Sequence, residues 1–187
     1  MSPSDKAEID VKQVSILAED MDHPEGVAVA PDGAVWCGGE DGQIYRIDPS
    51  EGKPEQVATT GGFVLGLAFS PDGSWMALCD PKNRAVIRMD TKTLRVDTLA
   101  EEVDGTHLQL PNYPVFASDG TLYVSDSGAF ERATGCVYAF DADGNGQLWT
   151  ESELTFANGI ALDADETFLY VVESFLPAIC RYRINPD

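Results

Sequence analysis

The strongest constraint on the fold is an internal repeat. Four segments each carry a short alternating apolar run, an Asp-Gly-type turn and a second alternating run. They cover residues 26–36, 66–78, 114–127 and 159–174. Their turns begin at Pro31, Pro71, Ser118 and Ala164, with spacings of 40, 47 and 46 residues. Units of this period bury their apolar faces by stacking on their neighbours, so the repeat predicts an architecture of stacked, similar sheets.

The repeat predicts an all-β chain folded as a β-propeller. Alternation of apolar and polar residues over about five to eight positions is typical of half-buried strands, and Asp-Gly turns are typical of hairpins. Further alternating runs complete each unit, which gives three or four antiparallel strands per repeat, the pattern of a propeller blade. A β-sandwich would show the same alternation without repeating the same turn at the same place.

We expect about four blades of a six-bladed ring. The fourth unit ends at Ile184 without a fourth strand, and a propeller protects its strand edges by closing the ring. The chain is therefore expected to be the N-terminal part of a longer propeller. We assign residues 1–20 to a polar N-terminus with a lone strand at 11–19, and residues 21–187 to a single domain of propeller repeats.

The balance of charges limits the possible partners. The sequence has 12 Lys and Arg residues against 32 Asp and Glu residues, a net charge of −20. Such a surface repels phosphate backbones and anionic lipids, so we expect no nucleic acid and no membrane partner. A solvated acidic surface is the favoured explanation, and adaptation to a salty environment is another. Cations and small molecules remain open as ligands, and the sequence does not indicate an oligomeric state.

The N-terminus and the cysteines favour a cytoplasmic location. No apolar run approaches the roughly 20 residues of a membrane span, and the opening MSPSDKAEID lacks the apolar region of a secretory signal. None of the cysteines belongs to a CxxC pair, and all lie in strand-like runs, which favours buried reduced thiols over disulfides or a zinc site. They are Cys37, Cys79, Cys136 and Cys180.

Three short stretches carry a resemblance to a known family. They read HPEGVAVAPDG around Glu25, LPNYPVFASDGTLYVSDSG around Asn112 and FANGIALDADETFLYVVES around Asn158. From about residue 20 onwards the chain resembles the SMP-30/gluconolactonase/LRE-like family. The resemblance implies a six-bladed propeller and a metal-dependent lactonase, in which a divalent cation polarises the lactone carbonyl and activates the attacking water.

The resemblance also implies roles for three residues. Glu25 and Asn158 would bind the metal directly, and Asn112 would lie nearby and contact substrate or metal-bound water. Each precedes the inner strand of a different repeat, so we expect the three to converge at the central channel. Carboxylate and amide oxygens are hard ligands, which favours Ca²⁺, with Mg²⁺, Mn²⁺ or Zn²⁺ as alternatives. Either asparagine could instead serve only a turn.

Two departures from the family pattern affect the substrate and the catalytic group. The family usually carries an arginine two positions before the equivalent of Asn112, where this chain has Leu110, and this departure weakens the expectation of a sugar lactone. The family's acidic ligand and general base would come from a blade beyond Asp187, so the catalytic residue is unknown. Arg132 is the basic residue that we would place near a substrate carbonyl, although a surface arginine is the favoured interpretation.

Other acidic residues suggest weaker hypotheses. Asp80, Asp126 and Glu173 end the second strand of successive repeats, so they could form an acidic column that attracts a cation. A solvated acidic face is the favoured interpretation. The segment that starts at Asp141 matches the first half of an EF-hand loop but has Ser152 at the twelfth position. A polar hairpin turn is therefore favoured there.

Other catalytic motifs are absent from the sequence, including GxSxG, the Walker loop and HExxH. His23 and His107 have no partner at ligand spacing, and His23, two residues before Glu25, is interpreted as an ordinary loop histidine. The first functional hypothesis is a metal-dependent hydrolase that opens a small-molecule lactone or ester. The alternatives are a non-enzymatic scaffold or ligand-binding propeller of the NHL or WD type, and a strictosidine-synthase-like or paraoxonase-like propeller.

Overall fold

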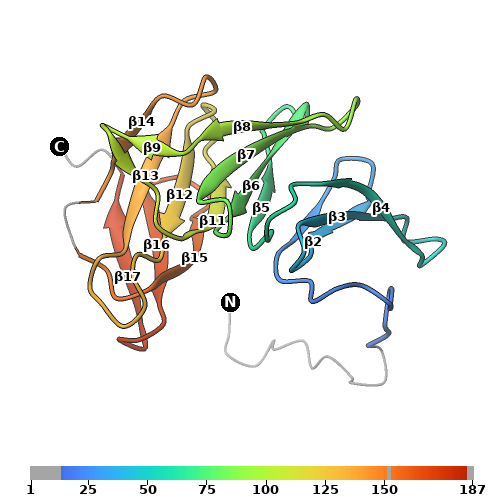
Figure 1. Ribbon diagram of the computed structural model, residues 1–187, viewed down its shortest axis with the longest axis horizontal. Coiled ribbons are helices and arrows are strands. Elements are labelled where there is room, and N and C mark those ends of the chain that lie inside the picture. Colours follow the sequence, from blue (N-terminus) through green and yellow to red (C-terminus); the bar gives the residue numbers. More distant parts are fainter. Residues whose placement is uncertain (1–13, 151–152, 185–187) are drawn as a thin grey trace.

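The computed structural model describes residues 14–150 and 153–184, and within these ranges the chain is built from strands and turns without a helix. Four antiparallel sheets follow one another along the chain (Figure 1). We call them blades 1 to 4. The all-β class and the propeller architecture with about four blades are therefore confirmed. Among the described residues, no helix is long and apolar enough to cross a membrane.

Blades 1 and 2 each have four strands in chain order. Blade 1 consists of β1 (Val27–Val29), β2 (Val35–Gly38), β3 (Gln43–Ile47) and β4 (Pro54–Thr59). Blade 2 consists of β5 (Leu67–Phe69), β6 (Trp75–Asp80), β7 (Ala85–Asp90) and β8 (Val96–Ala100). A small hairpin that the repeat did not predict, β9 (Glu102–Val103) with β10 (Thr106–His107), connects blade 2 to blade 3.

Blade 3 again has four strands, and blade 4 has three. Blade 3 consists of β11 (Pro111–Phe116), β12 (Leu122–Asp126), β13 (Cys136–Phe140) and β14 (Gly146–Leu148). Blade 4 consists of β15 (Ala157–Leu162), β16 (Phe168–Glu173) and β17 (Ala178–Arg183). Each of the four sequence repeats therefore forms the first two strands of one blade.

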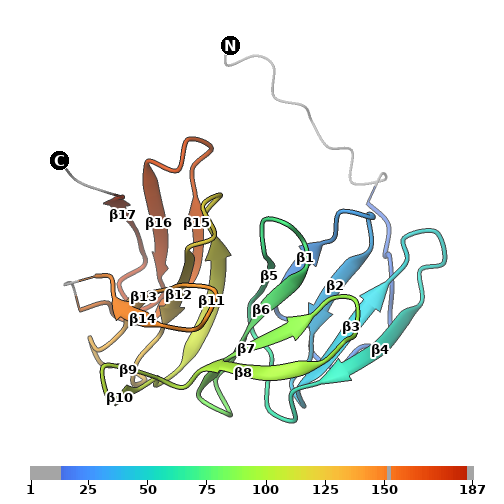
Figure 2. The ribbon, with the colours of Figure 1, turned by 90° about the horizontal axis from the view of Figure 1, so that it is seen from above.

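The core lies between successive blades. One cluster of buried side chains joins blades 1 and 2, a second joins blades 2 and 3, and a third joins blades 3 and 4. Between blades 2 and 3, for example, the Trp75 and Phe116 rings meet edge to face with centroids 4.9 Å apart. The inner strands β1, β5, β11 and β15 contact one another in this order, and Figure 2 shows the sheets standing side by side in an arc.

Two glycines allow the inner strands to approach closely. A Cβ on Gly26 would lie 2.4 Å from the carbonyl oxygen of Leu65, and one on Gly66 would lie 2.6 Å from the carbonyl oxygen of Asn112. The Gly66 amide also donates a hydrogen bond of 2.9 Å to that Asn112 carbonyl. Because only glycine fits such contacts, the glycine after Glu25 and its counterpart in blade 2 hold the starts of the inner strands around one axis.

The lone strand predicted at residues 11–19 needs a correction. Residues 14–19 form no strand, and residues 11–13 lie outside the described ranges. A strand requires a neighbour to take its backbone hydrogen bonds, and no described strand pairs with this segment. Val14 and Ile16 are accordingly 67% and 75% exposed.

Two smaller predictions are confirmed. The residues after Asp141 form the turn between β13 and β14, and the Asp141 carboxylate accepts hydrogen bonds from the Asp143 and Asn145 amides at 2.9 Å each. The EF-hand-like sequence is thus a polar hairpin turn over its described part. All four cysteines are free thiols, as expected; the expected burial holds for Cys37 and Cys79, whereas Cys136 and Cys180 are only half-buried. Burial raises the pKa of Cys79 well above its ordinary value and that of Cys136 to about 11.

Candidate functional site

A pocket of about 760 Å³ lies where the four blades meet. This volume is within the usual range for small-molecule sites. The segments leading into the inner strands of all four blades contribute to its lining, which includes the three residues singled out by the sequence, Glu25, Asn112 and Asn158. The expected convergence of these residues at the channel is therefore observed.

Both asparagines lie at irregularities of their inner strands. In β11 the pairing with β12 shifts between Pro111 and Tyr113, so Asn112 is the extra residue. In β15 the pairing with β16 shifts between Ala157 and Ile160, a stretch that contains Asn158. A β-bulge interrupts the alternation of side chains and re-aims one of them, which explains how a residue within a strand faces the pocket.

The Asn112 side chain is held in one orientation by a hydrogen-bond relay. Ser127 Oγ donates to the carbonyl oxygen of Ala157 at 2.6 Å, and Asn112 Nδ2 donates to the same Oγ at 2.9 Å. Ser127 is fully buried. Because the single hydroxyl proton of Ser127 goes to Ala157, its oxygen can only accept from Asn112. The side-chain nitrogen of Asn112 is thus hydrogen-bonded to Ser127, and its side-chain oxygen is left free to bind a ligand.

Asn158 is arranged in the same way. Its Nδ2 donates to Ser174 Oγ at 3.1 Å, while Ser125 Oγ donates to its backbone carbonyl at 2.6 Å. Among the described residues, neither Asn158 Oδ1 nor Asn112 Oδ1 accepts a hydrogen bond from the chain. A carboxylate and two amide oxygens with free lone pairs line one pocket, and this donor set fits a hard divalent cation.

The two other sequence-derived positions behave differently. Leu110 lines the pocket, so the place where the family usually has arginine is occupied by an apolar side chain. Arg132 is exposed in the loop that follows Gly128 and does not contribute to the pocket lining. Its assignment to substrate binding therefore has no support from the geometry.

The prediction that Asp80, Asp126 and Glu173 form a solvated acidic face is wrong. These side chains are only 0%, 2% and 3% exposed. Each carboxylate accepts backbone hydrogen bonds from the segment that leads into the inner strand of its own blade; Asp126, for instance, accepts from Gln109 and Leu110 at 2.8 Å each. Buried carboxylates are stable when such donors satisfy them. Asp80 and Asp126 accept on both oxygens, whereas Glu173 accepts only at Oε1, from Thr155, and its buried Oε2 has no partner among the described residues. Through these bonds the three residues fix the loops that carry the pocket residues.

Glu40 occupies the matching position of blade 1 and behaves differently. It is the seventh residue after Gly33, as Asp80 is the seventh after Gly73. The Glu40 side chain is 56% exposed, lines the pocket and lies 3.2 Å from His23 Nδ1. In the described part of the chain it accepts no backbone hydrogen bond, so blade 1 directs this carboxylate toward the pocket rather than into its own loop.

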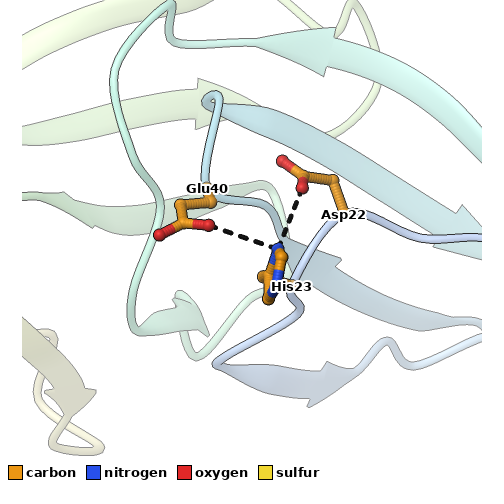
Figure 3. A group of neighbouring side chains, drawn as sticks. All are labelled: Asp22, His23 and Glu40. Atoms are coloured by element: carbon orange, nitrogen blue, oxygen red, sulfur yellow. Dashed lines mark hydrogen bonds and ion pairs between the residues drawn. The ribbon is translucent and has the colours of Figure 1, made fainter.

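Asp22, His23 and Glu40 form a small charged cluster beside the pocket (Figure 3). His23 Nδ1 lies 3.2 Å from Asp22 Oδ1 as well as from Glu40. The hydrogen bond to Asp22 raises the pKa of His23, and the negative charges of Glu40, Asp22 and Glu25 add to this effect. With its side chain 77% exposed, His23 belongs to a solvated charge cluster. Its interpretation as an ordinary loop histidine missed these two contacts, which the repeat position of Glu40 could have indicated.

The sequence matches two family models. Residues 82–187 match the SMP-30/gluconolactonase/LRE-like region, and residues 11–47 match the strictosidine synthase-like N-terminal model. The two matches are consistent with the repeat, since each covers different blades of the same propeller.

Relatives of both kinds are found among individual proteins. The protein strictosidine synthase-like 6 of Arabidopsis thaliana is 29% identical over 182 residues, which cover 88% of this chain and 48% of that protein. A gluconolactonase of Zymomonas mobilis is 31% identical over 120 residues, which cover 58% of this chain and 33% of the enzyme. The chain thus spans about half the length of the strictosidine synthase-like relatives that it matches.

A solved structure supports the fold. A gluconolactonase from Xanthomonas campestris superposes with a TM-score of 0.80, covering 91% of this chain and 61% of that one, at 22% identity. At this level of identity the likeness concerns the fold alone.

Proposed function

The chain belongs to the SMP-30/gluconolactonase/LRE-like family, and on this premise we propose that it is a metal-dependent hydrolase that opens a small-molecule lactone or ester. The cation would be held by Glu25 and Asn158, with Ca²⁺ favoured over Mg²⁺, Mn²⁺ and Zn²⁺. Asn112 would lie beside it and contact the substrate. When bound, the cation supplies Lewis-acid polarisation of the substrate carbonyl.

One observation carries the proposal. Glu25, Asn112 and Asn158 line a single pocket, and both asparagines turn their amide nitrogens to serine hydroxyls. These three residues thus offer oxygen atoms to the pocket, because the amide nitrogens of both asparagines are occupied by serines. Oxygen ligands suit a hard cation, whereas a pocket built for an anion would present donors.

The chain's own residues have defined tasks in this proposal. Ser127 and Ser174 orient the two amides, and Asp126 fixes the loop that carries Leu110. Glu25 supplies the negative charge that attracts the cation. Such outer partners matter, because removing one typically lowers metal affinity 10- to 100-fold.

A second candidate is a function of the strictosidine synthase-like type. It is favoured by the relatives, because strictosidine synthase-like 6 aligns over 88% of the chain whereas the gluconolactonase aligns over 58%. The apolar Leu110 in the pocket also departs from the pattern of the sugar-lactone enzymes. Both candidates share a small-molecule pocket at the channel, and they differ in whether lactones are hydrolysed.

Calorimetric titration with Ca²⁺, followed by assays on simple γ- and δ-lactones, tests the first candidate. We expect Ca²⁺ binding that falls more than about tenfold in Glu25→Gln and in Asn158→Ala. Asp119→Asn, an exposed turn residue outside this pocket, is the matched control and should bind as the unchanged protein does. Lactone turnover that rises with Ca²⁺ supports the hydrolase. Ca²⁺ binding unaffected by Glu25→Gln contradicts it, and small-molecule binding without turnover favours the second candidate.

A further inference from the structure

The wall of the pocket is largely apolar. Six of its lining side chains are apolar or aromatic, and all six are half-buried. Five come from the segments that precede the inner strands or from the starts of those strands, and they are Phe63, Leu65, Leu110, Tyr113 and Phe156; the sixth, Pro81, lies in the turn between β6 and β7. A pocket for a polyhydroxylated ligand needs several polar partners, because every buried hydroxyl must keep a hydrogen bond. Here most of the wall offers apolar surface.

Phe156 is braced from outside by two further aromatic rings. Its centroid lies 6.0 Å from that of Phe130 and 5.1 Å from that of Phe175, and these two are 5.0 Å apart, all in edge-to-face arrangements. Such pairs attract beyond simple burial. Phe130 and Phe175 are nevertheless 67% and 41% exposed, so an aromatic cluster extends from the pocket wall to the surface.

The backbone of Phe156 is also unusual. Its φ is +67°, a strained conformation that bulky residues rarely adopt. Such strain persists where the surrounding structure enforces it, and it is common at ligand sites. The strain therefore accompanies the one aromatic ring that joins the cluster to the pocket.

The charges of the pocket and of the whole chain bear on which ligands can bind. Glu25 and Glu40 line it together with a single lysine, Lys82. Leu110 adds apolar surface and no charge to the lining. A bound divalent cation would offset the two glutamates, but the net charge of −20 of the whole chain still disfavours the approach of anionic substrates.

We propose that the substrate is an uncharged lactone or ester that bears an alkyl or aryl substituent, and that this substituent packs against Phe156, Leu110 and the rest of the apolar wall. The inference rests on the proposed function, because it names the substrate class of the same pocket. Each methylene buried against this wall tightens binding roughly fourfold, the equivalent of about 0.8 kcal/mol.

Binding of lactams tests the proposal independently of hydrolysis, because a lactam keeps the ring and carbonyl of a lactone but resists opening. We would measure affinities by ligand-observed NMR for δ-valerolactam, for its propyl and pentyl derivatives and for a polyhydroxylated δ-lactam. We expect affinity to rise about two- to fourfold per methylene and the polyhydroxylated compound to bind weakest. Equal or tighter binding of the polyhydroxylated lactam overturns the proposal.

Two variants and a control locate the effect. Phe156→Asn removes the ring, and asparagine tolerates a positive φ; Leu110→Gln removes apolar surface at similar size. Each should weaken binding of the pentyl lactam at least fivefold and change that of the parent lactam less than twofold. Leu148→Gln, on an exposed strand outside this pocket, should change neither. Unchanged pentyl binding in both pocket variants overturns the inference.

The two proposals fail separately. Turnover of lactones that does not improve with an alkyl substituent overturns the substrate class and leaves the hydrolase intact. Lactam binding that depends on the alkyl group, without turnover of any lactone, supports the substrate class and overturns the hydrolysis.

Discussion

Removing the hydroxyl of Ser127 should lower the stability of the propeller, and comparison with a second serine variant should distinguish this effect from a loss of Ca²⁺ binding in the pocket. In Ser127→Ala, Ala157 loses the donor at 2.6 Å and Asn112 Nδ2 loses its acceptor at 2.9 Å. Both partners are in the buried interior between blades 3 and 4. A buried polar group left unpaired costs about 1–3 kcal/mol, so two such groups should destabilise the protein by about 2–6 kcal/mol.

Ser174→Ala is the matched control. It removes the hydroxyl that orients Asn158, at 3.1 Å, but Ser174 is exposed and water can replace the lost partner. Its cost to stability should lie within about 0.5 kcal/mol. Its cost to Ca²⁺ binding should be larger, about 10-fold or more, because Asn158 is the proposed ligand and Ser174 is the partner that orients it.

Urea unfolding and thermal melting measure the stability of both variants, and calorimetry measures their Ca²⁺ affinity. For a chain of this size 1 kcal/mol corresponds to about 2–4 °C, so Ser127→Ala should lower the melting temperature by roughly 4–24 °C. A shift below about 1 °C would refute the buried relay. Ca²⁺ affinity of Ser174→Ala within twofold of the unchanged protein would refute the role of Asn158.

Further predictions follow from other contacts. Asp126→Ala leaves three backbone amides without their acceptor, so it should lower the free energy of unfolding in urea by about 3–5 kcal/mol. The exposed Asp119→Ala should lower it by only about 0.5–1 kcal/mol. Equal effects of the two variants would contradict the loop-fixing role of Asp126. Hydrogen bonds from Ser74 and Ser70 lower the pKa of Asp72 to about 2. Its stabilising contribution is therefore present above the ordinary value of 3.8 and is lost as the pH falls from about 4 to about 2, so Asp72→Asn should flatten the stability curve in that window; an unchanged acid limb speaks against these hydrogen bonds. Thiol titration of the denatured, unreduced protein should find all four cysteines free, and any smaller number would reveal a disulfide.

The fold was predictable because its signal repeats. The recurring turns at Pro31, Pro71, Ser118 and Ala164 mark the hairpins between the first two strands of each blade, and four agreeing copies outweigh the ambiguity of any short apolar run. The segment at residues 11–19 lacked such copies. Its alternation predicted a strand, but local pattern cannot supply the neighbour that a strand requires.

The site was predictable in its residues and not in its geometry. The repeat register placed Glu25, Asn112 and Asn158 at one end of the inner strands, whereas the bulges that turn the asparagines toward the pocket depend on strand pairing. The charge of Asp126 suggested exposure, because a sequence does not show which backbone amides will surround a carboxylate. The aromatic cluster around Phe156 brings together residues of three separate loops, so no periodic pattern in the sequence predicts it.

The central claim is that Glu25 and Asn158 bind one divalent cation in the pocket between the blades. A crystal structure of the protein grown with Ca²⁺ tests it most directly. The account predicts an ion with oxygen atoms of both residues at about 2.3–2.6 Å, and with Asn112 beside it. An ion held only by Asp22, His23 and Glu40, or a well-ordered pocket without an ion at saturating Ca²⁺, would contradict the account.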